Sequence, residues 1–129
     1  TRENAALNDL TPQKLFNGNL FDPFSIEQRW HLIVSNPPYI RETEISSLQP
    51  EVRNFDPHEA LSGGQQGWEI PLALMKQAFH HLEPRGALVM EIDSSQFGVL
   101  EKCSLKQGWI SVNSIVDYQQ KIRFIVANL

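Results

Sequence analysis

The chain has 129 residues, of which 15 are acidic and 11 basic, and its formal charge is −4. This length allows one small domain, and the acidic balance argues against charge-driven binding of nucleic acid. No apolar run approaches the roughly 18 residues of a membrane helix, so no membrane association is expected. The single cysteine excludes an internal disulfide and a cysteine-rich zinc site.

The first half of the chain is expected to contain a helix, two strands and a long loop. Residues 2–10 have the composition of a helix end, and residues 14–17 predict a short strand that Gly18 ends. Residues 30–35 (WHLIVS) form a continuous apolar run, which is typical of a strand buried on both faces of a parallel sheet. Residues 39–67 contain three glycines and two prolines, and they predict a long irregular stretch.

The next part of the chain predicts a helix, a strand and a second helix. Residues 68–82 place apolar side chains three and four positions apart, which indicates an amphipathic helix. Residues 87–92 (ALVMEI) predict another buried strand. Residues 96–106 predict a helix that Ser94 or Ser95 caps and Gly108 ends.

The last part of the chain predicts two more strands. Residues 110–116 and 122–127 are apolar and are separated by a short polar segment, so an antiparallel hairpin is expected. Strands that alternate with helices indicate an α/β layered sheet. Such sheets bind ligands at the carboxyl ends of their strands, which draws attention to Asn36, directly after the most apolar predicted strand.

The tetrapeptide Asn36-Pro37-Pro38-Tyr39 has the residue types of a site for a planar NH2 group. The two prolines fix successive φ angles and remove two N–H donors, so the carbonyls around them are free to accept hydrogen bonds. Asn36 adds a side-chain carbonyl, and Tyr39 adds a flat aromatic face. Two rigid acceptors beside a stacking surface would orient an amide or arylamine nitrogen toward an electrophile. The plainer interpretation is a turn that only ends the strand.

The segment LIVSNPPYI resembles the motif of amino methyltransferases that use S-adenosylmethionine and methylate adenine, cytosine N4 or glutamine. Residues 57–67 resemble the EPxxALxGGxxGL segment of HemK-type glutamine methyltransferases, which modify peptide-chain release factors. Further stretches resemble the same family in the same order. They are Arg2-Glu3-Asn4-Ala5, Gly18-Asn19-Leu20-Phe21, Met90-Glu91-Ile92 with Gln96, and Asp117 with Arg123-Phe124.

This resemblance implies a Rossmann-like class I fold of S-adenosylmethionine-dependent methyltransferases, with residues 1–129 as the carboxyl-terminal portion of a single domain. It implies that Asn36 and the Pro37 carbonyl hold the substrate amide, in one substrate-binding tetrapeptide with Pro38, and that Tyr39 flanks the amide. The implied reaction is N5-methylation of the glutamine in a release factor's Gly-Gly-Gln tripeptide, by direct displacement at the sulfonium methyl. Such an enzyme would work in the cytoplasm or, alternatively, in mitochondria.

The resemblance also assigns residues to the cofactor, S-adenosylmethionine. Asn19 and Leu20 are expected beside its adenine ring, and Asn36 near its methionine part. The family's Gly-rich cofactor loop and first two strands have no counterpart here, since the seven glycines contain no G-x-G run. The fold is therefore expected to be incomplete, and strand 30–35 to have an unpaired apolar edge that invites self-association. The chain also departs from the family at two positions. The family usually has Asp where this chain has Asn19, and it usually has Gly near the position of Gln120.

Two other functions stay open at this point. An adenine or cytosine amino methyltransferase acting on nucleic acid is disfavoured by the charge of −4 and by residues 57–64. A non-catalytic, truncated remnant is suggested by the missing cofactor loop. No metal is expected, because the adjacent His80 and His81 would point about 100° apart on a helix and are interpreted as a solvated helix end.

Overall fold

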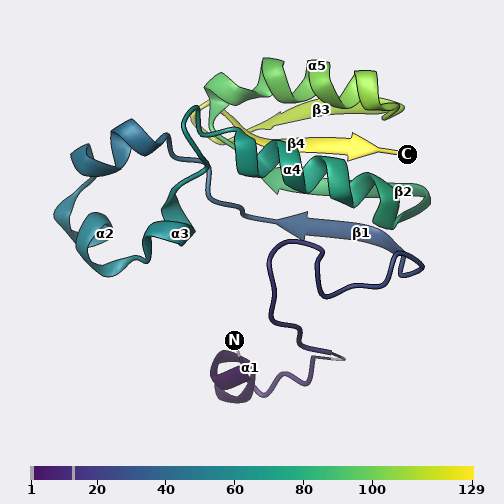
Figure 1. Cartoon of the computed structure of the whole chain (residues 1–129), viewed down its shortest axis with the longest axis horizontal. Coiled ribbons are helices and arrows are strands. Elements are labelled where there is room, and N and C mark those ends of the chain that lie inside the picture. Colours follow the sequence, from purple (N-terminus) through teal and green to yellow (C-terminus); the bar gives the residue numbers. More distant parts are fainter. Residues whose placement is uncertain (1, 13) are drawn as a thin grey trace.

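The computed structural model describes residues 2–12 and 14–129, which form a four-stranded sheet flanked by helices (Figure 1). The strands are β1 (Trp30–Ser35), β2 (Leu82–Glu91), β3 (Ser111–Val116) and β4 (Ile122–Asn128), in the spatial order β1-β2-β4-β3. β1 and β2 are parallel, whereas β4 is antiparallel to both β2 and β3. The predicted hairpin is confirmed, and β1 lies at the edge of the sheet as expected.

The helices lie in three different places relative to the sheet. The α-helices are α1 (Arg2–Leu7), α2 (Pro50–Phe55), α3 (His58–Leu61), α4 (Glu69–Ala78) and α5 (Phe97–Gln107). The 3-10 turns are η1 (Glu42–Ser47), η2 (Phe79–His81) and η3 (Ser94–Gln96). Figure 1 shows α4 and α5 against the sheet, α2 and α3 beyond the carboxyl end of β1, and α1 apart from the sheet. None of the described helices has the length and apolar composition to cross a bilayer.

The hydrophobic core lies between one face of the sheet and helices α4 and α5. Leu88 and Met90 of β2 and Ile125 of β4 are fully buried there. They form one cluster with Met75 of α4 and Leu100 of α5. The predicted amphipathic helix is confirmed over Glu69–Ala78, where its apolar side chains cover this face of the sheet, but it ends four residues before the predicted end at Leu82, which belongs to β2.

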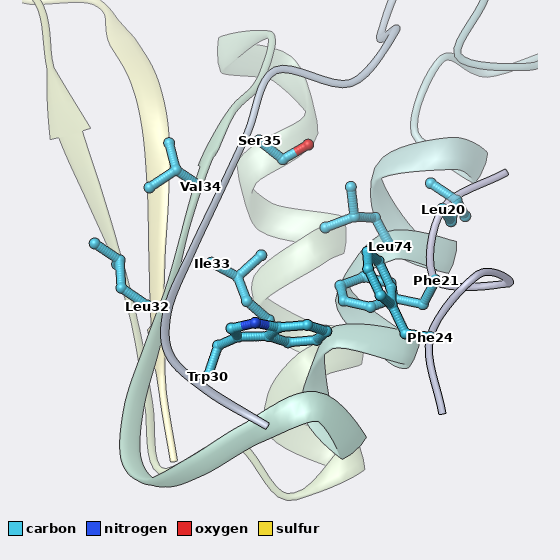
Figure 2. A pocket seen from close by; sticks show the side chains of 9 residues that line it. All are labelled: Leu20, Phe21, Phe24, Trp30, Leu32, Ile33, Val34, Ser35 and Leu74. Atoms are coloured by element: carbon cyan, nitrogen blue, oxygen red, sulfur yellow. The ribbon is translucent and has the colours of Figure 1, made fainter. Parts of the chain in front are cut away.

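The opposite face of β1 is open, so the prediction of a strand buried on both faces is wrong. Leu32 and Val34 leave 56% and 69% of their surface exposed. Figure 2 shows both side chains on the far side of β1 from Ile33, which points toward Leu74 of α4. Burial on both faces requires covering elements on both sides, and α4 covers β1 on one side only.

Three other expectations about secondary structure are corrected. Residues 14–17 are not a strand, and Phe16 instead packs its ring against Phe24 at 4.9 Å between centroids. Residues 39–67 are not irregular throughout, since they include η1, α2 and α3. β2 begins at Leu82, five residues before the predicted start at Ala87, because Leu82 already pairs with Trp30 of β1.

The second helix of the core has a different cap from the one predicted. Asp93, not Ser94 or Ser95, caps η3, which leads into α5, and its carboxylate accepts a hydrogen bond from Ser95 N at 2.9 Å. Gln96 completes a reciprocal capping box with Asp93. Gly108 ends α5 with a φ of 116°, in the left-handed region that glycine tolerates, so that prediction is confirmed.

Candidate functional site

The tetrapeptide leaves the sheet at the carboxyl end of β1, beside β2. Ser35, the last residue of β1, pairs with Met90 of β2, and Asn36 follows it. Asn36 is exposed, Pro37 is buried, and Tyr39 is half-buried. Among the described residues, none donates a hydrogen bond to the Asn36 side-chain oxygen or to the Pro37 carbonyl. Neither oxygen has a donor among these residues, and the exposed Asn36 side chain is open to a ligand, three positions before Tyr39 in the chain.

Tyr39 is hydrogen-bonded to the last residue of β2 and to the segment that follows β2. Its hydroxyl donates to Glu91 Oε1 at 2.9 Å, and its carbonyl accepts from Gln96 Nε2 at 2.8 Å. Burial raises the pKa of Tyr39 above its usual range, and the hydrogen bond and negative charge of Glu91 raise it further. The hydroxyl therefore keeps its proton at neutral pH and remains a hydrogen-bond donor.

The glycine-containing segment 57–67 lies directly against the residue after Tyr39. Ile40 N donates to Leu61 O at 3.0 Å, and Gly63 N donates to Ile40 O at 2.9 Å. These bonds form a short parallel bridge between Ile40 and Ser62. The motifs of residues 36–39 and 57–67 carried the family resemblance, and their nearest ends, Tyr39 and Pro57, are 18 positions apart in the chain. The two motifs thus meet in space at one site.

A second polar cluster lies on the exposed side of this bridge. Glu42 accepts from Ser62 Oγ at 2.5 Å, and its other oxygen lies 2.8 Å from His58 Nε2. The Ser62 hydrogen bond and then the His58 contact lower the pKa of Glu42. Because the carboxylate lies between the serine and the histidine, the histidine is not placed to take the serine proton. The sequence analysis did not identify this cluster.

An apolar hollow of about 380 Å³ lies beside β1 and reaches its carboxyl end. The loop side chains Leu20, Phe21 and Phe24 face β1 across it, and Ser35 lies at its upper end in Figure 2. The structure therefore brings Leu20 to the same end of β1 as Asn36. Asn19, the other residue expected near adenine, precedes Leu20 and is exposed.

The interpretation of His81 as part of a solvated helix end is wrong. His81 is 5% exposed, its ring stacks on Phe21 at 4.9 Å, and its Nδ1 lies 2.9 Å from the Gln28 carbonyl oxygen. It anchors the aromatic loop, which is the loop before β1 that carries Phe21 and Phe24 and forms one wall of the hollow. His80, in contrast, is exposed. Within residues 2–12 and 14–129, no three His, Cys, Asp or Glu side chains gather closely enough to hold a metal ion.

Curated proteins similar in sequence to this chain are release factor glutamine methyltransferases. The one from Thermodesulfovibrio yellowstonii is 34% identical over 115 residues, which are 89% of this chain and 41% of that protein. The one from Fusobacterium nucleatum is 32% identical over 125 residues, 97% of this chain and 35% of that protein. The chain thus spans about two fifths of the length of these relatives. No protein-family model matches it.

Solved structures similar to this chain share its fold at low sequence identity. The methyltransferase from Pyrococcus furiosus has a TM-score of 0.67 and 20% identity, and the match covers 98% of this chain and 54% of that one. The ribosomal protein L11 methylase from Lactobacillus delbrueckii subsp. bulgaricus has a TM-score of 0.64 and 20% identity, covering 98% of this chain and 50% of that one.

The sequence relatives share one name, and the fold is that of methyltransferases. The predicted order of helices and strands ends in the observed antiparallel hairpin, and the sheet matches methyltransferases over nearly the whole chain. The motifs of residues 36–39 and 57–67 meet at the carboxyl end of β1. The chain is therefore a relative of the release factor glutamine methyltransferases, and its sheet is part of the Rossmann-like class I fold of S-adenosylmethionine-dependent methyltransferases.

Proposed function

We propose that this chain carries the amide-binding part of a methyltransferase domain that transfers a methyl group from S-adenosylmethionine to the Gly-Gly-Gln glutamine of a release factor. The observation that carries the proposal is that Asn36 Oδ1 and the Pro37 carbonyl, in one tetrapeptide with Tyr39 at the end of β1, accept no hydrogen bond from the described residues. The sequence relatives bear the name of this activity. The corresponding place of action is the cytoplasm or, alternatively, the mitochondrion.

The two acceptors address the main difficulty of the reaction. An amide nitrogen is a weak nucleophile because its lone pair is delocalised into the carbonyl group. Asn36 and the Pro37 carbonyl would take one hydrogen each, fix the plane of the NH2 group, and favour the positive charge that develops on nitrogen during attack. The proline rings keep these acceptors rigid, and Tyr39 flanks the amide and excludes water from one side.

We expect the described residues to contact the adenine and methionine ends of S-adenosylmethionine. The apolar wall formed by Leu20 suits one face of an adenine ring, and Asn19 next to it offers a side-chain amide. Asn36 would lie near the methionine part. The lining of the hollow contains no acidic side chain for the ribose hydroxyls, so the fit concerns these two ends. When bound, the cofactor supplies an electrophilic methyl group.

The direct test is transfer of a labelled methyl group from S-adenosylmethionine to a release factor. We expect incorporation at the Gly-Gly-Gln glutamine, located by mass spectrometry, and a fall of about 10²–10³-fold in Asn36→Ala. Asn113→Ala is the matched control, because Asn113 is an exposed asparagine on β3, and it should keep the wild-type rate. Incorporation into DNA but not into the release factor would contradict the proposal.

Binding of S-adenosylhomocysteine separates an incomplete enzyme from a remnant. A concentration of a hundred times the dissociation constant should stabilise the folded chain by about 2.7 kcal/mol in thermal unfolding. Cooperative unfolding without a shift, together with no methyl transfer, would show a folded chain that binds no cofactor. That pair of results would favour the non-catalytic alternative.

A further inference from the structure

Tyr39 is hydrogen-bonded through its side chain to the end of β2 and through its main chain to the connection between β2 and α5. Glu91, which accepts from the Tyr39 hydroxyl, is the last residue of β2. Gln96, which donates to the Tyr39 carbonyl, is the last residue of η3. These two bonds join residues 52 and 57 positions apart in the chain. The orientation of the ring is therefore set from outside the tetrapeptide.

Gln96 is a buried amide whose two ends are both engaged. It is 3% exposed, its Nε2 donates to the Tyr39 carbonyl, and its Oε1 accepts from Asp93 N at 3.3 Å. Loss of either partner would leave a buried polar atom of Gln96 without a hydrogen bond. Because this is energetically costly, the two contacts keep one geometry. Gln96 therefore holds the main chain of Tyr39 at a set position relative to the start of α5.

Gly67 leaves the space in which this hydrogen bond forms. A Cβ atom at Gly67 would lie 2.6 Å from the Tyr39 carbonyl oxygen and 2.9 Å from Gln96 Nε2. The φ of Gly67 is +82°, which also favours glycine. A Cβ at Gly63 would lie 2.7 Å from Tyr39 Cα. The glycines of segment 57–67 thus allow it to close against Tyr39 from the other side.

We propose that Glu91 and Gln96 are positioning residues for Tyr39. Glu91 fixes the ring through the hydroxyl, and Gln96 fixes the main chain, so that the ring forms a rigid wall of the amide site. This inference deepens the proposed function and rests on it. Neither residue needs to touch the substrate, since each acts through Tyr39. A misplacement of about 1 Å in such a positioning group can lower turnover by about a hundredfold.

The kinetic test compares two substitutions of Glu91. Glu91→Gln keeps an acceptor for the hydroxyl and should retain most of the turnover, whereas Glu91→Leu should lower kcat by about 10–100-fold with little change in KM. Glu83→Leu, at the opposite end of β2, is the matched control and should leave kcat unchanged. In a Tyr39→Phe background, Glu91→Leu should cause no further loss. A further loss of the same size would overturn the proposal.

Titration of the Tyr39 hydroxyl tests the contact without any methyl transfer. The chain has two tyrosines, so a Tyr118→Phe variant reports Tyr39 alone through the ultraviolet absorption of its phenolate. Glu91→Gln should lower the titration midpoint because it removes a negative charge beside the phenol. Asp93 and Arg123, the other charged groups that act on Tyr39, stay unchanged. An unchanged midpoint would overturn the role of Glu91.

The two readouts separate failure of this inference from failure of the proposed function. A wild-type protein that transfers no methyl group contradicts the proposed function, while the titration still decides whether Glu91 holds Tyr39. Gln96→Met removes both amide hydrogen bonds at similar length and should lower kcat as Glu91→Leu does. Full turnover in a folded Gln96→Met protein would overturn the role of Gln96. If that variant does not fold, the Glu91 series decides alone.

Discussion

One face of the sheet is closed and the other is open at β1, although both faces carry apolar side chains. On the closed face, Leu88, Met90 and Ile125 are fully buried beneath α4 and α5. On the open face, Leu32 and Val34 of β1 remain more than half exposed. The difference teaches that apolar composition alone does not determine burial, because burial also depends on a covering helix.

The candidate site lies between these two environments. Asn36 continues from β1, the edge strand, where its acceptors face solvent. Tyr39 is instead bonded to Glu91, the half-buried last residue of β2, and to Gln96, which is buried. The site thus combines the exposed Asn36 side chain with hydrogen bonds that hold Tyr39 in place.

The largest expected effect is a difference between two leucines on neighbouring strands. Leu88→Ala removes a fully buried side chain from the closed face and should lower the free energy of unfolding by about 2–5 kcal/mol. Leu32→Ala, on the open face, should change it by about 0.5 kcal/mol or less. Denaturant unfolding of both variants measures the difference. Equal losses would break the comparison, since they would show that the open face is covered in solution.

The second prediction concerns the aromatic loop, which lies on the same side of β1 as α4. His81→Phe keeps a ring against Phe21 but leaves the Gln28 carbonyl without its partner. It should lower the free energy of unfolding by about 1–3 kcal/mol. His80→Phe is the exposed control and should change it by about 0.5 kcal/mol or less. If His81→Phe has the same free energy of unfolding as this control, the contacts of His81 do not stabilise the fold, and the aromatic loop behaves like the open face.

Elements with a local signal were predictable from the sequence. The helical spacing of residues 68–82 and the two apolar runs of the hairpin depend on neighbours in the chain. The hairpin is confirmed, and the helix is confirmed over Glu69–Ala78. The burial of β1 was not predictable, because it depends on which elements cover the strand. Leu15 and Phe16 suggested a strand, but an apolar pair does not supply a strand partner.

The site was predictable in part. The residue types of Asn36 and Tyr39 indicated acceptors and a flat ring, but the bond from Tyr39 to Glu91 depends on the parallel pairing of β1 and β2. No spacing in the sequence shows that pairing. The expected glycine position near Gln120 has a physical reason in the structure, because Gln120 has a φ of +62°, a conformation that glycine adopts with less strain.

The third prediction concerns the cap of the segment that leads into α5, which covers the closed face. The Ser95 hydroxyl, with the Ser95 N–H, holds the pKa of Asp93 below its usual range. Asp93→Ala should lower the free energy of unfolding by about 1 kcal/mol at neutral pH. The folded pKa is depressed, so this stability is present above the unfolded pKa and is lost as the pH falls through the folded value.

The measurement is the difference in unfolding free energy between wild type and Asp93→Ala across pH. This difference should shrink as the pH falls below about 4, the usual pKa of aspartate. Ser94→Ala is the control, since Ser94 is the exposed neighbour that does not form the cap. A difference that stays constant down to strongly acidic pH would show that the Asp93 carboxylate does not stabilise the start of α5.

The smallest expected effect on stability tests the open edge itself. One side of β1 pairs with β2, and its other edge and its open face invite association of chains through Leu32 and Val34. We expect the wild-type chain to associate as its concentration rises in sedimentation, and Val34→Lys to reduce this association. The free energy of unfolding should change by about 0.5 kcal/mol or less. Ser114→Lys adds the same charge at an exposed position of β3, the opposite edge strand, and should associate like the wild type. If both variants reduce association equally, the added charge and not the open face of β1 controls association. If neither reduces it, chains do not associate through Leu32 and Val34, and this face is stable in water without a partner despite its apolar side chains.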